Sequence, residues 1–237
     1  MARSRRGFLK GAAAGAAVAV VAPPHAATAQ ETTPRNATAQ PNATTVAADT
    51  GRRPATVASR IVEKPGSDFM VDVLKTLDFE YLAANPGSTF EGLHESLINY
   101  GDNKMPEFLT CCHEESAVAM AHGYAKIEGK PMIAMMHGTI GMQHASMAIY
   151  NAYVDRVPIY MVAGNHADGA ERTPGVASLH SAQDIGALVR DYVKWDDQPY
   201  SLGHFAESAV RAYNIAMTPP MAPVLIVANH ELQAHPN

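Results

Sequence analysis

The amino-acid sequence predicts a three-layer αβα domain, α/β in class, with a mostly parallel sheet buried on both faces. From about residue 60, short continuous apolar runs alternate with stretches of helical periodicity. Parallel strands that are covered on both faces have this continuous apolar character, and intervening helices provide the cover. Apolar residues make up 47% of the 237-residue chain and charged residues 17%, a balance typical of a protein with a true core.

Composition excludes several functional classes. The chain has 18 Lys and Arg against 23 Asp and Glu, a formal net charge of −5, and no basic stripe, so nucleic acid is not an expected partner. Its two cysteines, Cys111 and Cys112, are adjacent. That spacing fits neither a disulfide framework nor a C-x-x-C zinc or redox site.

The first 29 residues contain the three parts of an export signal in order. Four basic residues and no acidic ones precede the apolar run Gly11 to Ala22, and Ala27-Thr28-Ala29 is a typical cleavage site. The string Ser4 to Lys10 resembles a twin-arginine signal. We therefore predict a twin-arginine-type signal peptide at 1–29, export to the periplasm and no membrane span after cleavage. The alternative is a basic N-terminal helix that stays attached.

Residues 30–58 are predicted to form a flexible, disordered linker. They are rich in Thr, Ala, Asn and Pro and show no apolar periodicity, so burial cannot offset the entropy of ordering them. The folded domain is expected over 59–237.

The elements of this domain are predicted from periodicity and turn residues. Ser67 and Asp68 are expected to cap a first helix that turns Phe69, Val71 and Leu74 inward. Strands are predicted at 81–84, 107–112, 131–136, 158–163, around Val193 and at 224–227. Further helices are predicted at 89–99, 114–126, 142–154 and about 203–217, with residues 138–141 as a loop.

Four loops that follow strands are rich in Gly, Asn and His: 85–88, 112–115, 137–141 and 164–166. Open parallel sheets bind ligands beyond the carboxyl ends of their strands. Glycine permits close approach of the backbone, and helix N-termini offer free N–H groups. These loops are therefore expected to build one site together.

The same region carries a resemblance to a known family. In order along the chain come Asn85-Pro86-Gly87, His113-Glu114 followed by Gly123-Tyr124-Ala125, Asp155-Arg156-Val157-Pro158, Val162-Ala163-Gly164 and Val193-Lys194-Trp195. Together they resemble the N-terminal, pyrimidine-binding domain of thiamine-diphosphate-dependent enzymes of the acetolactate synthase and 2-oxo-acid decarboxylase type. The resemblance runs from about residue 60 to 232.

The resemblance implies a catalytic glutamate at Glu114. In the family this carboxyl group hydrogen-bonds N1′ of the cofactor's aminopyrimidine ring and so promotes loss of the proton from C2 of the thiazolium; the cofactor performs the carbanion chemistry. The residues expected to bind the cofactor are Pro86, Gly87, Ser88, Glu114, His137, Gly138 and Asn165. A simpler interpretation is that Glu114 and Glu115 are first-turn acids that favour the helix dipole.

A protein-bound metal is not expected. The histidines at 113, 137, 144 and 166 are potential zinc ligands, but position 117 is Ala, so the chain has no H-E-x-x-H motif. The resemblance also has departures, because His137-Gly138-Thr139-Ile140 replaces the Ser-Gly-Pro-Gly of many members and Asn165 stands where a Gln is common. These departures concern the loops and the choice of substrate.

The family also binds Mg²⁺ and the diphosphate through a Gly-Asp-Gly motif followed by an Asn, which this sequence lacks. Gly101-Asp102-Asn103 is not that motif, since the second Gly is absent. We therefore expect a pyrimidine-binding domain or subunit that needs a diphosphate-binding domain or subunit, forms a dimer or higher oligomer, and acts on a small 2-oxo acid by decarboxylation or carboligation. The alternatives are a non-catalytic exported binding or regulatory domain, and an enzyme with its own histidine-based site.

Overall fold

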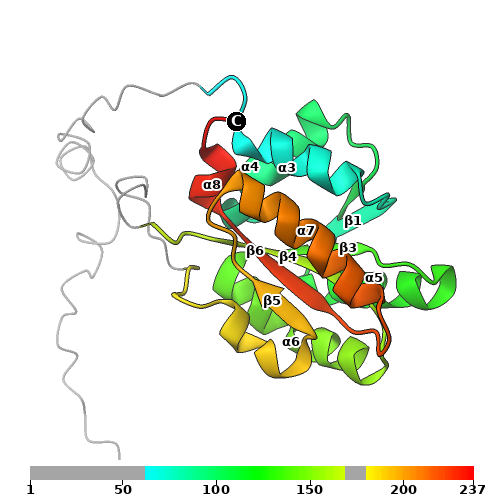
Figure 1. Cartoon of the computed structure of the whole chain (residues 1–237). Helices are drawn as coiled ribbons and strands as arrows, with labels where there is room; N and C mark the ends of the chain where they lie inside the picture. The colour runs from blue at the N-terminus through cyan, green and yellow to red at the C-terminus, as the bar shows by residue number, and fades with distance from the viewer. Residues whose placement is uncertain (1–61, 169–179) are drawn as a thin grey trace, which may run out of the picture. The chain divides into compact units, whose positions relative to one another are not determined.

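The computed structural model describes residues 62–168 and 180–237, which contain a six-stranded parallel sheet (Figure 1). The strand order is β2-β1-β3-β4-β6-β5, and every paired neighbour is parallel. The predicted three-layer α/β domain is thereby confirmed. The predicted signal at 1–29 and linker at 30–58 lie outside the described residues.

The strands are short, and the central ones are buried throughout. Their bounds are β1 Tyr81–Ala84, β2 Glu107–Thr110, β3 Ile133–Met136, β4 Tyr160–Asn165, β5 Trp195–Asp197 and β6 Val224–Asn229. The two outermost strands, β2 and β5, are partly exposed, as expected at the edges of a sheet.

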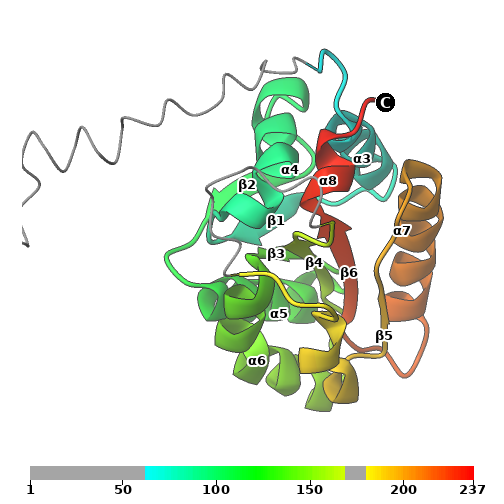
Figure 2. The same cartoon turned by 90° about the vertical axis from the view of Figure 1, so that its left-hand side faces the viewer.

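Helices cover both faces of the sheet (Figure 2). One face carries α3 Gly66–Lys75, α4 Glu91–Glu95, α7 Leu202–Met217 and α8 His230–Ala234. The other face carries α5 Glu114–Glu128 and α6 Gly138–Val154, and the 3₁₀ turns Gly186–Leu188 and Arg190–Tyr192 lie on the same side. The helix predicted at 89–99 is built from three consecutive pieces: a 3₁₀ turn at Ser88–Phe90, α4, and a π-helical turn at Ser96–Tyr100.

Alternation along each central strand divides the core into two halves. Ile133 and Met135 of β3 pack into the half beneath α3 and α7, whereas Ala134 and Met136 pack into the half beneath α5 and α6. Successive side chains of a strand point to opposite faces. A continuous apolar run therefore contributes side chains to both halves of the core. For this reason the sequence predicts a sheet that is covered on both faces.

Four sequence predictions need correction in detail. Residues 138–141 form the first turn of α6 and not a loop. Ser67 and Asp68 do not cap α3, which begins after Pro65; instead Ser96 Oγ lies within hydrogen-bond distance of both, 2.7 Å from Ser67 Oγ and 2.7 Å from Asp68 Oδ1. The strand predicted around Val193 lies slightly later, at β5, and β2 ends at Thr110, before the cysteines.

The end of the chain returns to the start of the domain. The N–H of Gly66 donates to the carbonyl oxygen of His235 at 2.6 Å, and the N–H of Asn237 donates to that of Lys64 at 2.8 Å. Both views show α8 beside α3 (Figures 1 and 2).

In the part of the chain that the structure describes, we find no helix with both the length and the apolar character needed to cross a membrane.

The packing of Phe79 makes a testable prediction about stability. Its ring is 1% exposed, with its centroid 4.9 Å from that of Tyr160 and 5.6 Å from that of Tyr213. Phe79→Ala should lower the free energy of unfolding by about 3–5 kcal/mol, because it leaves a cavity in the core. Ile127→Ala, at a side chain 83% exposed, should change it by less than about 0.5 kcal/mol. Urea unfolding of the full chain, followed by circular dichroism, measures both; equal effects would contradict the described packing.

Candidate active site

The parallel sheet collects the predicted loops at one edge. Residues 85–88 follow β1, Glu114 follows β2, His137 follows β3, and Asn165 ends β4. These four strands are consecutive in the sheet. Because parallel strands end at the same edge, the loops that the sequence singled out lie at neighbouring positions.

Glu114 is the first residue of α5 and is almost completely buried, with an exposed fraction of 2%. His113 precedes it as the N-cap, and its Nδ1 accepts a hydrogen bond from the N–H of Glu115 at 3.2 Å. A carboxylate at this position is favoured by the N-terminal end of the helix dipole. Glu114 Oε2, however, is buried and has no hydrogen-bond partner among the described residues.

Glycine makes room for this carboxylate. A Cβ atom at Gly141, in the first turn of α6, would lie 3.1 Å from Glu114 Oε1 and 3.2 Å from its Cγ. Such a contact is tighter than van der Waals distance, so a larger residue at 141 would push the carboxyl group away. The absence of a side chain at Gly141 therefore leaves room for the Glu114 carboxyl group.

His137 stands beside Glu114 and is held by Thr89. Thr89 Oγ1 and His137 Nδ1 are 2.8 Å apart, and the N–H of Gly138 donates to the same hydroxyl oxygen at 3.0 Å. The imidazole also makes an edge-on contact with His180, with ring centroids 4.6 Å apart. Burial lowers the pKa of His137 below its ordinary value, and nearby His180 lowers it further, whereas the Glu114 carboxylate opposes this shift.

Two glycines allow the loops to approach this imidazole. A Cβ at Gly87 would lie 2.5 Å from His137 Cγ, and one at Gly138 would lie 2.1 Å from the carbonyl oxygen of His180. Neither distance is possible for a real Cβ, so any other residue would force the loops apart. Gly87, Gly138 and His137 thus form one packed unit, as the four-loop prediction expects.

The other predicted site residues have different surroundings. Pro86 and Ser88 are exposed at the end of β1. Asn165 is completely buried, and its side-chain amide pairs with the backbone of Ala182: Nδ2 donates to the carbonyl oxygen at 3.1 Å, and Oδ1 accepts from the N–H at 3.3 Å. In this structure Asn165 therefore fixes the segment at Ala182.

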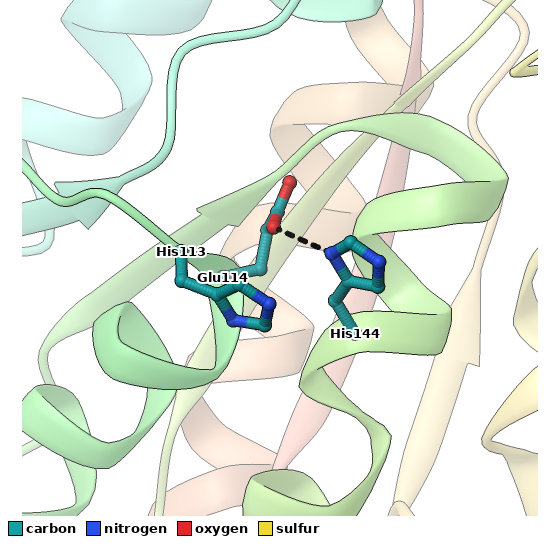
Figure 3. Close-up of side chains that lie close together, drawn as sticks. All are labelled: His113, Glu114 and His144. Atoms are coloured by element: carbon teal, nitrogen blue, oxygen red, sulfur yellow. Dashed lines mark ion pairs between the residues drawn. The ribbon is translucent and has the colours of Figure 1, made fainter.

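Two histidines flank the buried carboxylate (Figure 3). His144 Nδ1, from the second turn of α6, lies 3.4 Å from Glu114 Oε2 and forms an ion pair with it when the imidazole is protonated. The rings of His113 and His144 stack with centroids 4.7 Å apart and planes 7° apart. The side chain of His144 is 54% exposed, so solvent reaches this side of the site.

Sequence reasoning missed two residues of this arrangement. The sequence predicts Thr89 only as the start of a helix, and no motif includes His180. Both act across long stretches of sequence, since Thr89 and His137 are 48 positions apart. No local pattern marks such a contact.

A hollow lies along the same edge, at the ends of β4 and β6. It has a volume of about 840 Å³, and its lining includes Gln183, Tyr200, Asn229 and Glu231 but neither Glu114 nor His137. The carboxyl group predicted to be catalytic is therefore outside this cavity.

Comparison with known proteins agrees with the geometry. Residues 64–187 match the family model described as thiamine pyrophosphate enzyme, N-terminal TPP binding domain. The chain is 24% identical over 158 residues to the acetolactate synthase of Bacillus subtilis (strain 168), covering 66% of this chain and 26% of that protein. It is 26% identical over 167 residues to the acetolactate synthase large subunit of Lactococcus lactis subsp. lactis (strain IL1403), covering 70% and 28%.

Among solved structures, benzoylformate decarboxylase from Polynucleobacter necessarius has the same fold, with a TM-score of 0.63 and 22% sequence identity. The match covers 73% of this chain and 31% of that one. This chain spans about a quarter of the length of the curated relatives it matches.

The environment of His137 predicts a pH dependence. Because its pKa is lower in the folded chain than the unfolded value of about 6.5, the unfolded state binds more protons as the pH falls below that value. The stability contributed by neutral His137 is therefore present above about pH 6.5 and lost below it. NMR titration of the imidazole C–H signals, assigned with His137→Gln, should give a pKa below 6.5; a value at or above 6.5 would contradict the described burial.

Proposed function

The chain belongs to the thiamine pyrophosphate enzyme family, as the N-terminal TPP binding domain, and from this premise we propose that it supplies the pyrimidine-binding half of an active site that acts on a 2-oxo acid. The reaction is a decarboxylation or a carboligation. Acetolactate synthases and a decarboxylase among its relatives support this class of reaction.

One observation carries the proposal: Oε2 of Glu114 is buried and has no hydrogen-bond partner among the described residues. Burying a polar atom without a hydrogen bond costs about 1–3 kcal/mol, and more for a charged group. A carboxyl group in this state is prepared for a donor that the described residues do not provide. A ring nitrogen of an aminopyrimidine is such a donor when it carries a proton.

The neighbouring residues fit a flat ring system. Gly141 keeps the space beside the carboxyl group free of a Cβ, and Gly87 allows the loop after β1 to approach His137. We assign to Glu114 the binding of the ring nitrogen and the sharing of its proton. His137, whose pKa burial lowers, lies beside the cofactor's ring together with Pro86, Gly87, Ser88 and Gly138, and the buried Asn165 supports this edge through its pairing with Ala182. Bound thiamine diphosphate supplies the carbanion chemistry of the reaction.

We place the Mg²⁺ and diphosphate site on another domain or partner chain. Within this chain, Gly101-Asp102-Asn103 precedes β2 and so lies at its amino end, at the sheet edge opposite Glu114. Its groups are used structurally: Asn103 Oδ1 accepts the N–H of Phe108 at 2.8 Å, and the carbonyl oxygen of Gly101 accepts from Lys75 Nζ at 3.0 Å. These contacts support a turn that shapes the start of β2.

We also propose that the domain assembles as a dimer or higher oligomer and that the twin-arginine signal at 1–29 exports it to the periplasm. The outer face of α6 supports the assembly, because Met147, Tyr150 and Val154 are 62%, 48% and 52% exposed. Exposed large apolar side chains along one helix are typical of protein interfaces.

Native mass spectrometry of the complex purified from its own source tests the incomplete site and the export together. We expect thiamine diphosphate bound to this chain with a companion chain, or to a single chain far heavier than this one. The N-terminus should have lost residues 1–29. A lone chain near this mass, without cofactor, would exclude the catalytic proposal and leave a binding domain; an intact residue 1–29 segment would exclude the signal.

Replacing Glu114 tests its role in that complex. Glu114→Gln should slow deuterium exchange at C2 of the bound cofactor by about 100-fold or more, since general acid–base groups contribute about 10²–10⁴-fold. NMR of quenched samples measures the exchange. Glu115→Gln is the matched control, because Glu115 is the exposed neighbour on the same helix turn. Equal exchange in the two variants would contradict the assignment of Glu114.

A further inference from the structure

The cluster of His113, Glu114 and His144 has the composition of a metal site. Each residue offers one ligand atom, and the three atoms all lie within 4.8 Å of one another. Two imidazoles and one carboxylate form a donor set that binds Zn²⁺ with a fourth position left open. Figure 3 shows the two rings side by side, with the carboxyl group of Glu114 reaching toward His144.

The distance between two of these atoms fits coordination better than hydrogen bonding. His144 Nδ1 and Glu114 Oε2 are 3.4 Å apart, beyond the usual range of an N–H···O bond. Zinc binds nitrogen and oxygen at about 2.0–2.2 Å, so two ligands on a tetrahedral ion lie about 3.3–3.5 Å from each other. The pair therefore already has the spacing of one edge of a zinc tetrahedron.

The third ligand is His113, and bringing all three ligand atoms to one ion requires a side-chain rotation. The rings of His113 and His144 are nearly parallel, so the lone pairs of their nitrogens do not converge on one point as they stand. His144 is 54% exposed and can turn toward the ion without disturbing the core. The buried Oε2 gives the independent reason for a ligand, because it has no hydrogen-bond partner among the described residues.

We propose that His113, Glu114 and His144 bind a transition-metal dication of the Zn²⁺ class, with water at the open position. The metal ion and the cofactor's pyrimidine ring would bind the same Glu114 carboxylate, so we expect each to exclude the other. This competition rests on the proposed function. The sequence analysis did not expect a metal here, because His113 caps α5 and His144 lies in α6, so the two histidines form no H-E-x-x-H turn.

Zinc binding to the cofactor-free full chain tests the site directly. Zn²⁺ binding is measured in competition with a chromophoric chelator. The unaltered chain should bind one more equivalent of Zn²⁺ than His113→Asn and His144→Asn, or bind it more than about 10-fold more tightly. Loss of a group that merely orients a metal ligand already lowers metal affinity by about 10–100-fold. Asn at 113 retains an N-cap for α5. Circular dichroism verifies that each variant is folded.

The control is His122→Asn, which removes a histidine from a different histidine–carboxylate pair, His122 Nε2 and Asp155 Oδ2, 3.1 Å apart. It should bind zinc as the unaltered chain does. Electron paramagnetic resonance of bound Cu²⁺ gives a second readout: coupling to two imidazole nitrogens in the unaltered chain and to one in either ligand variant. Equal zinc binding and equal copper spectra in all chains would overturn the proposal.

A separate arm, with thiamine diphosphate added to the complete complex, keeps the two proposals distinguishable. If Zn²⁺ binds the chain but does not displace the cofactor, the metal site stands and its competition with the pyrimidine is wrong. If the chain binds no Zn²⁺ while Glu114→Gln still slows C2 exchange as expected, the metal site is wrong and the proposed function stands.

Discussion

The buried carboxyl group of Glu114 is the constraint on which the rest of this domain depends. Its Oε2 lies in the interior without a hydrogen bond among the described residues, and a buried polar atom in that state destabilises the fold. The helix dipole of α5 offsets part of that cost. The remainder is offset by apolar packing around the start of α5, where Ala117 and Val118 are fully buried against the sheet. The domain thus stabilises an unsatisfied group at the edge where ligands bind parallel sheets.

Thr89 connects this site to the rest of the fold. Its hydroxyl holds His137 and the N–H of Gly138, and its carbonyl oxygen accepts a hydrogen bond from Gln233 Nε2 at 3.0 Å. Gln233, in α8, is completely buried, and its Oε1 accepts the N–H of Leu93 at 2.9 Å. A Cβ at Gly164 would lie 2.3 Å from the carbonyl oxygen of Thr89, so β4 also passes close by. The last helix of the domain therefore fixes the position of His137, although it is far from His137 in sequence.

The sheet and its helices were predictable from sequence because apolar periodicity reports which faces are buried. The rule that ligands bind at the carboxyl ends of parallel strands predicted the loops that contain Glu114, His137 and the glycines, and the family resemblance implied the role of Glu114. What failed depended on tertiary contacts. Gly138 and Gly141 suggested a loop, but the first turn of α6 needs them so that His180 and Glu114 can approach. Ser67 and Asp68 suggested a cap, but Ser96 binds both. Thr89 and His180 have no local signal.

Both proposals for this site depend on the same atom, Oε2 of Glu114. A ring nitrogen of a cofactor, the imidazole of His144 and a metal ion would all satisfy Glu114 Oε2, and only one of them can do so fully at a time. His144 at 3.4 Å is too distant to compensate the carboxylate as a short charge-assisted hydrogen bond would. It is close enough to attract the carboxylate electrostatically when protonated, and to share an ion with it. Under the two proposals, the position of His144 therefore leaves Glu114 Oε2 available to the cofactor's ring nitrogen or to a metal ion.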